Sequence, residues 1–256
     1  MDIRNLVAGR GARRALVAAA LAGGALAAHA GLVYDANVTN AVIYGSGNAN
    51  GGWTVDTQNN IELGLRAHVR YPTPLNVFNS NGAGTYTFPA GGFGGSGTLA
   101  GWNFDFSINV DPAGLGGRTI GTLTYLLGFD TDPSQGVNFI AFNPLLAIGD
   151  NAFGNNSTPG GGGVKAGGGT TQATLAGQYN LMQNSENLGW FGPGFNPAAN
   201  GTYSFFLEAL GDGVPLARTD ITVVVGTGGA AVPEPASLAL VGVALLGAAV
   251  ARRRRA

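Results

Sequence analysis

The sequence contains no cysteine, which excludes a disulfide framework, a thiolate metal site and a catalytic thiol. Charged residues are also scarce, at 11% of the chain against roughly 25% in ordinary globular proteins. Between residues 31 and 232 the chain has five basic and twelve acidic residues, a net charge of −7. Because phosphate contacts need clustered lysine and arginine, this balance excludes nucleic acid as a partner of the central region.

The first 30 residues have the pattern of a secretion signal. Four arginines precede an apolar run over residues 15–26, and Ala28-His29-Ala30 follows. A basic start, a short apolar run and an A-x-A exit are typical of a signal peptide. We therefore predict that residues 1–30 are removed by signal peptidase, with Ala28 and Ala30 as the small residues of the cleavage site. An uncleaved anchor is the alternative, and the Arg13-Arg14 pair leaves a twin-arginine route open.

The last 24 residues form a second apolar segment with two distinct flanks. Residues 236–251 carry no charge, and as a helix these 16 residues would span about 24 Å. That is short of a hydrocarbon core of about 30 Å, and arginine snorkelling offsets the difference. We predict a transmembrane helix whose basic end stays in the cytoplasm. The flanking residues are Pro233, Glu234 and Pro235 before the helix and Arg252, Arg253, Arg254 and Arg255 after it.

This order of triplet, apolar helix and arginine cluster resembles a PEP-CTERM sorting signal covering residues 233–256. The resemblance implies that exosortase, a transpeptidase-like membrane enzyme, recognises the tail and cuts near the triplet. It also implies transient anchoring in the inner membrane of a Gram-negative cell and a final location in the cell envelope or outside the cell. Proteins with such tails are typical of bacteria that make exopolysaccharide and biofilm. An ordinary tail anchor is the alternative that hydropathy alone leaves open.

Between the two signals, residues 31–226 predict an all-β domain, with residues 227–232 as a linker. Short runs of β-forming residues are separated by Gly, Asn, Asp and Pro, and no long helical period occurs. Such a series predicts an antiparallel β-sandwich, jelly-roll-like, with an immunoglobulin-like order left open. The expected strands cover residues 32–38, 41–44, 62–71, 102–110, 119–129, 137–142, 201–209 and 216–225.

The remaining segments predict loops and one short helix or turn. The last two strands should form a hairpin with a loop longer than two residues. Residues 88–101 and 151–169 are rich in glycine and are expected to be loops. Residues 175–188 are the best candidate for a short helix or turn, with the polar stretch 184–187 exposed. Three stretches also resemble the bodies of other PEP-CTERM proteins, which supports a sandwich and implies no substrate: residues 125–130, 183–189 and 201–205.

No catalytic constellation is visible in the body, and we predict a protein that is not an enzyme and needs no cofactor. His68 is the single histidine that remains after signal removal, which excludes a two-histidine zinc site. No Gly-x-Ser-x-Gly elbow accompanies it, so we expect a strand residue rather than a triad member. The acidic residues stand mostly at turns, where Asp caps backbone groups, and sequence spacing cannot reveal a facing glycosidase pair.

Two small ligand sites remain as hypotheses. Asp130 and Asp132 lie two residues apart in an expected loop and are candidates for calcium, which takes 6–8 oxygen ligands from loops. The simpler interpretation of the pair is an Asp-rich β-turn. Trp190 and Phe191 lie in a loop rich in Gly and Pro and form the candidate ligand patch, because exposed aromatic rings can stack on sugars.

The sequence thus predicts an exported protein of the cell envelope or extracellular matrix. Its expected role is structural or adhesive and non-enzymatic, linked to exopolysaccharide or biofilm. The alternative is a carbohydrate-binding module, or a weak carbohydrate-active enzyme, on the same sandwich.

Overall fold

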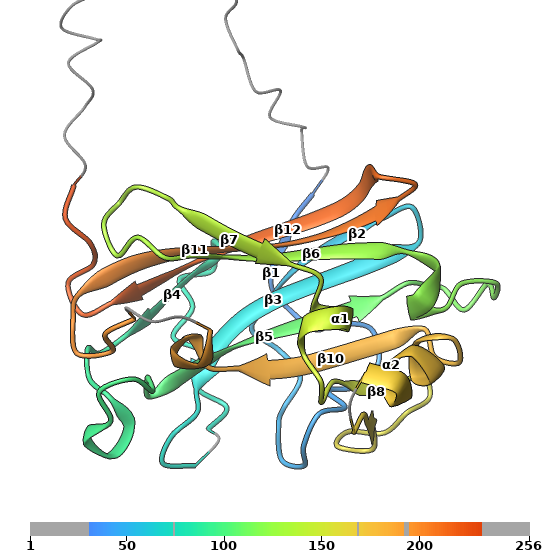
Figure 1. Ribbon diagram of the computed structural model, residues 1–256, viewed down its shortest axis with the longest axis horizontal. Coiled ribbons are helices and arrows are strands. Elements are labelled where there is room, and N and C mark those ends of the chain that lie inside the picture. The colour runs from blue at the N-terminus through green and yellow to red at the C-terminus, as the bar shows by residue number, and fades with distance from the viewer. Residues whose placement is uncertain (1–30, 74, 168, 192–194, 232–256) are drawn as a thin grey trace, which may run out of the picture.

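The computed structural model describes residues 31–231 except residues 74, 168 and 192–194. They form two β-sheets packed face to face around one main hydrophobic core (Figure 1). The prediction of a mostly β, two-sheet body is therefore confirmed. The predicted signal peptide, the helix over residues 236–251 and the arginine cluster lie outside the described residues. Within the described ranges, no helix is both long enough and apolar enough to cross a membrane.

The larger sheet has seven strands in the order β1-β2-β3-β5-β10-β8-β9, and all neighbours are antiparallel. Its centre is formed by β3, β5 and β10, whose pairing is continuous over six or more residues. The strands are β1 (Val33–Ala36), β2 (Trp53–Gln58), β3 (Ile61–Val69), β5 (Trp102–Asn109), β8 (Ala152–Gly154), β9 (Val164–Lys165) and β10 (Leu181–Glu186).

The smaller sheet has five strands in the order β4-β12-β11-β6-β7. Its edge strand β4 runs parallel to β12, with Thr85 opposite Thr222, so the expectation of purely antiparallel pairing is wrong at this edge. The two strands lie far apart in the chain, which provides the long connection that parallel pairing requires. The strands are β4 (Thr85–Phe88), β6 (Thr124–Asp130), β7 (Phe139–Phe142), β11 (Gly201–Gly211) and β12 (Val214–Val225).

Short helices connect the strands. In α1 (Pro144–Ala147), the N-cap Asn143 accepts a hydrogen bond from the Leu145 amide through its side-chain oxygen, and proline occupies the first helical position. The other helix is α2 (Gly169–Ala176), and the 3₁₀ turns are η1 (Phe93–Gly95), η2 (Ile120–Thr122) and η3 (Leu188–Trp190).

The alternation of β5 separates the core from a second, polar face. Trp102, Phe104, Phe106 and Ile108 point into the core between the sheets. The residues between them face away from the core, because successive side chains on a strand alternate. They are nevertheless buried, since residues 37–52 fold over this outer face and pack Val42 and Ile43 against Trp53 and Leu181 in a second small core.

Four local predictions are corrected by the structure. Residues 175–188 are not a helix or turn throughout, because residues 181–186 form strand β10 and pair with β5 along their whole length. In the stretch 184–187, Asn184, Glu186 and Asn187 are buried and Ser185 is half-buried, so the predicted exposure is wrong. Residues 41–44 form no strand and belong to the covering segment, and residues 151–169 include two short strands, β8 and β9.

The hairpin that joins β11 to β12 also differs from its prediction. Its loop has two residues, Asp212 and Gly213, rather than more. Both have positive φ, 50° and 79°, which is the pattern of a type I′ turn. An Asp-Gly pair adopts this turn readily, and its twist matches the twist of the flanking strands.

The start of the expected linker is attached to the smaller sheet. The Gly229 amide donates to Thr202 Oγ1 at 2.9 Å, and the Gln135 amide donates to the Ala230 carbonyl at 2.9 Å. The described part of the linker, residues 227–231, is therefore tied down along its length.

Candidate functional site

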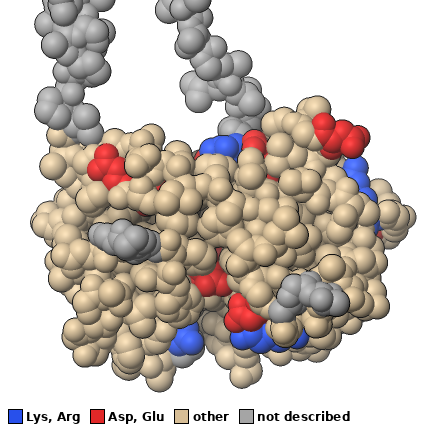
Figure 2. Space-filling model, in the orientation of Figure 1, with Lys and Arg blue, Asp and Glu red and all other residues tan. Residues whose placement is uncertain are grey.

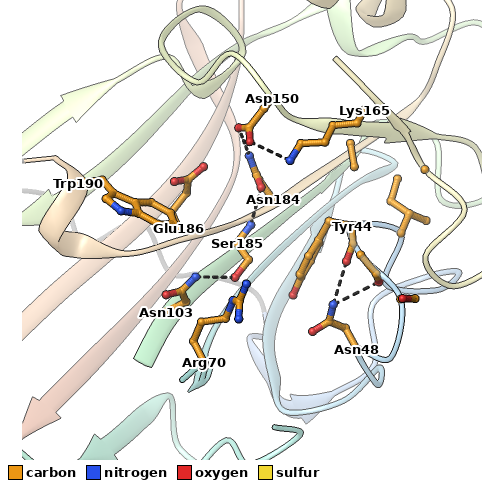
Figure 3. A pocket seen from close by; sticks show the side chains of 15 residues that line it. Tyr44, Asn48, Arg70, Asn103, Asp150, Lys165, Asn184, Ser185, Glu186 and Trp190 are labelled. Carbon is orange, nitrogen blue, oxygen red and sulfur yellow. Dashed lines mark hydrogen bonds and ion pairs between the residues drawn. The ribbon is translucent and has the colours of Figure 1, made fainter. Parts of the chain in front are cut away.

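A pocket of about 690 Å³ opens at the free edge of β10, and its lining residues come from both faces of that strand (Figure 3). Strand β8 pairs with residues 181–183 of β10 only, which leaves the edge at residues 184–186 open. The covering segment forms the opposite wall. The lining residues are Ile43, Tyr44, Gly45, Ser46, Asn48, Arg70, Asn103, Asp150, Ala152, Gly163, Lys165, Asn184, Ser185, Glu186 and Trp190.

The two residues of the predicted aromatic patch lie in different surroundings. Trp190 ends η3, is 53% exposed and lines the pocket. Phe191 packs against the core instead, where its ring stacks on Phe142 with a centroid distance of 5.5 Å. Asn187 fixes this turn by accepting a hydrogen bond from the Gly189 amide. Only Trp190 of the pair therefore offers a ring to a ligand in the pocket.

Acidic and basic groups meet at the open end of the pocket. The Asp150 carboxylate lies 3.0 Å from Lys165 Nζ and accepts a hydrogen bond from Asn184 Nδ2 at 3.1 Å. Lys165 and Asp150 are 68% and 54% exposed, so their ion pair contributes little to stability. Both charged groups are accessible to a ligand.

Glu186 is the unusual carboxyl of the pocket. It is the last residue of β10, lies opposite the core residue Phe104 and is only 6% exposed. Burial, reinforced by the negative charge of Asp150, raises the pKa of Glu186 to about 8, and Lys165 only partly opposes this. Its side chain has no hydrogen-bond partner in the described part of the chain. At neutral pH most molecules therefore carry a protonated, unpaired carboxyl group here.

A buried ion pair supports the pocket from below. Arg66 Nε donates to Asp105 Oδ2 at 2.7 Å, and the guanidinium also donates to Tyr44 Oη at 2.9 Å. Tyr44 Oη donates a short hydrogen bond to Asp105. The Arg66 guanidinium lies over the rings of Trp53 and Phe78, 4.2 and 4.7 Å from their centroids. This network holds the Tyr44 side of the pocket against the sheet.

Electrostatics keep this network in one ionisation state. Burial opposes the ionisation of Asp105, but the positive charges of His68, when protonated, and Arg66 outweigh it and hold the pKa of Asp105 well below its usual range. Burial, followed by the negative charge of Asp105, raises the pKa of Tyr44 well above its ordinary value. Asp105 is thus a carboxylate and Tyr44 a neutral donor over the physiological pH range.

His68 lies in β3, which confirms the prediction of a strand residue, and its side chain is buried. Its Nε2 atom lies 3.1 Å from Asp105 Oδ1 and 3.4 Å from Ser185 Oγ. A serine, a histidine and an aspartate thus adjoin, but a triad needs the carboxylate and the hydroxyl at opposite ring nitrogens. Here both lie at the same nitrogen, so the three side chains do not have the geometry of a catalytic triad.

Asp130 and Asp132 form turn contacts at the end of β6. Asp130 Oδ1 accepts hydrogen bonds from the amides of Asp132 and Asn138 at 2.9 and 2.7 Å. Asp132 Oδ1 accepts one from the Ser134 amide at 2.9 Å. Asp130 Oδ2 is buried without a partner among the described residues. These residues contain no group of three or more His, Cys, Asp or Glu side chains placed to hold a metal ion. The calcium hypothesis stays a prediction.

The comparison with protein families concerns the C-terminal segment. Residues 231–255 match the family described as the PEP-CTERM protein-sorting motif. The chain carries a PEP-CTERM sorting motif. The motif indicates that the protein is exported, sorted to the cell envelope and processed by exosortase. Comparisons with curated proteins and with solved structures find no match.

Sequence reasoning found Trp190 in this PEP-CTERM protein but missed the rest of its pocket. The charged residues that line the pocket are Arg70, Asp150, Lys165 and Glu186. They come from segments far apart in the chain, and no local spacing links them. Strand β10 contained a usable signal. Its second half is polar, yet it pairs with the central strand β5 and is mostly buried, which is unusual for polar residues.

Proposed function

We propose that this PEP-CTERM protein is a non-enzymatic, adhesive component of the cell envelope or extracellular matrix that holds exopolysaccharide in the pocket at Trp190. Export and sorting deliver the protein to the compartment where such a polymer is found. Before processing, the apolar segment over residues 236–251 anchors it transiently in the inner membrane. In a biofilm, each processed molecule would bind the polymer and so link it to the other components of the matrix.

The observation that carries this proposal is an exposed tryptophan at a concave, polar pocket. The Trp190 side chain is 53% exposed, although large aromatic residues are usually buried in a monomer. In the same pocket, Asn103 Nδ2 donates to Ser185 Oγ at 3.0 Å, and the Asn184 amide is held by Asp150 at 3.1 Å. A flat apolar ring beside amide and hydroxyl groups suits a sugar, which has an apolar face and a rim of hydroxyls.

A binding measurement tests this proposal. The full chain is expressed in a host with exosortase, and the mature protein is purified from the envelope fraction and titrated with polysaccharides on an array and by calorimetry. We expect Trp190→Ala to bind at least about tenfold more weakly, since it removes the central ring. The matched control is Leu146→Ala, because Leu146 is 80% exposed in α1 and does not line the pocket.

Two results would contradict the proposal. One is wild-type affinity in Trp190→Ala, and the other is the failure of every matrix polysaccharide to bind. Both variants change exposed side chains, so unfolding would not explain a loss confined to Trp190→Ala.

A weak carbohydrate-active enzyme is the second candidate, and Glu186 is the observation that favours it. A buried carboxyl with a pKa of about 8 has the protonation state of a general acid, and Asp150 is a second carboxyl at the same pocket. Release of reducing ends from a bound polysaccharide, lost in Glu186→Gln, would favour this candidate over simple adhesion.

A further inference from the structure

The charges of the pocket point to the class of sugar that it binds, an inference that rests on the proposed function. We propose that the pocket takes a carboxylate-bearing sugar unit, a uronate, of an acidic polysaccharide, with Arg70 as the cation that meets the carboxylate. Glu186 lines the same pocket and provides a carboxylic acid that donates a hydrogen bond to the bound polymer.

Arg70 is a cation without an anionic partner. It follows β3, is half-buried, and its guanidinium points into the pocket toward Ser185 (Figure 3). Lys165 and Arg66, by contrast, each have a carboxylate partner within 3.0 Å. Among the described residues Arg70 has no ion pair and donates no hydrogen bond. Its guanidinium lies over the ring of Tyr71, 5.0 Å from the centroid. A guanidinium fork with free donors matches a carboxylate in geometry and charge.

Arg70 is a cation in a body that is acidic and poor in charged residues. Charged residues are few on the face that Figure 2 shows. A general electrostatic attraction for anions is therefore excluded. Recognition of an acidic sugar would depend on local groups in the pocket, where a partly buried charge is screened less than an exposed one.

Glu186 would repel an anionic sugar if it were ionised, but burial keeps it protonated at neutral pH. A protonated carboxyl donates one hydrogen bond, and this one is unpaired and faces the pocket. A hydrogen bond to a charged acceptor is stronger than one to a neutral acceptor. A carboxylate of the ligand is therefore a good acceptor for the proton of Glu186.

The other titratable groups near Glu186 leave the pocket without a net negative charge at pH 7. The exposed pair of Asp150 and Lys165 is neutral overall. Below the pocket, the charge of Asp105 is balanced by Arg66, and Tyr44 is neutral. Among the described Arg, Lys and Asp side chains around the pocket, Arg70 is then the one without a balancing charge. His68, 3.1 Å from Asp105 Oδ1 and 3.4 Å from Ser185 Oγ, is the remaining titratable side chain below the pocket.

A pH dependence follows from this arrangement. As the pH rises through about 8, Glu186 loses its proton, stops donating and repels the ligand carboxylate. The ligand carboxylate is ionised throughout this range. Binding of the acidic sugar should therefore be strong near pH 6–7 and weak near pH 9.

The test compares a uronate-containing polysaccharide with its carboxyl-reduced, neutral counterpart, using the mature protein and calorimetry at pH 6, 7 and 9. We expect wild type to bind the acidic polymer about tenfold or more tightly than the neutral one at pH 7, because one charge-assisted hydrogen bond changes the affinity by about that factor. Arg70→Gln should remove this preference. Arg118→Gln is the matched control, because Arg118 lies outside the pocket. Glu186→Gln should flatten the fall in affinity between pH 7 and 9.

The outcomes separate this inference from the proposed function. Equal binding of the two polymers by wild type, or an unchanged preference in Arg70→Gln, overturns the uronate inference while the sugar pocket stands. Binding of neither polymer, together with none on the array, overturns both. The wild-type preference is measured on the unaltered protein, so the inference remains falsifiable even if Glu186→Gln does not fold.

Discussion

Arg66 and Asp105 lie directly opposite each other on β3 and β5 and form a fully buried ion pair, with Nε and Oδ2 2.7 Å apart. The same guanidinium donates through Nη1 to the carbonyls of Ala49 and Gly51, at 2.9 and 2.7 Å. One cross-strand pair therefore fixes both the centre of the larger sheet and the segment that covers it. The Tyr44 wall of the pocket depends on this pair.

Removing one partner of the pair should be strongly destabilising. Asp105→Asn leaves the Arg66 charge buried and uncompensated, and we expect a loss of about 3–5 kcal/mol in the free energy of unfolding. Denaturant unfolding measures it. The control is Asp220→Asn, which removes a carboxylate 2.7 Å from Arg218 at a site that is 40% exposed and should cost less than about 1 kcal/mol. Similar losses in the two variants would refute the supporting role of the buried pair.

Glu186 should make stability depend on pH. Its pKa is about 8 in the folded protein and near 4.5 in an unfolded chain, so the folded state holds its proton more tightly. The stabilising contribution is complete below about pH 4.5 and disappears as the pH rises through about 8. Glu186→Gln cannot ionise, so its Tm relative to wild type should increase by several degrees between pH 6 and pH 9. Thermal unfolding at both pH values measures it, and a constant Tm difference would show that Glu186 does not titrate in this range.

The two-residue turn between β11 and β12 should tolerate little change. Gly213 has φ of 79°, which a residue with a Cβ adopts at a cost, so Gly213→Ala should lower the free energy of unfolding by about 1 kcal/mol. Gly149→Ala is the control, because Gly149 has no positive φ and nothing lies within 4 Å of the added Cβ. If the two substitutions have the same effect, the turn imposes no conformational requirement.

The sorting tail should decide where the protein ends up. Cells that express the chain without residues 233–256 should release the body into the periplasm or medium, because exosortase loses its recognition segment. Replacement of Arg252–Arg255 by alanine should impair sorting in the same direction, since the basic cluster sets orientation in the membrane. Cell fractionation and immunoblotting measure both. Unchanged localisation of the shortened chain would count against sorting by this segment.

Sequence alone predicted the parts of this protein that depend on local pattern. The C-terminal motif and the alternation of residues 102–110 are patterns of neighbouring residues, and the family match and strand β5 agree with them. The signal peptide over residues 1–30 stays a prediction. Strand β10 was missed because its Asn184 and Glu186 look like exposed residues. In the fold, Asn184 Nδ2 instead donates to Asp150. Buried polar residues have no distinctive pattern until their partners are known.

The pocket could not be predicted for a related reason. Trp190 was found because a tryptophan in a glycine-rich loop is conspicuous. Arg70 and Glu186 attract attention only once the fold shows that both line one pocket without a hydrogen-bond partner among the described residues. Their proximity follows from the pairing of β3 with β5 and of β5 with β10. That strand order joins residues far apart in the chain.

The central claim is that the exported protein holds matrix polysaccharide at Trp190, and its retention in the matrix of living cells tests this most directly. The measurement is the fraction of processed protein that stays with the extracellular polysaccharide after washing, for wild type and for Trp190→Ala expressed at equal levels. We predict that wild type is largely retained, and that Trp190→Ala is largely washed out although it is processed normally. Equal retention of the two proteins, or equal retention of wild type on cells that make no exopolysaccharide, would contradict the claim.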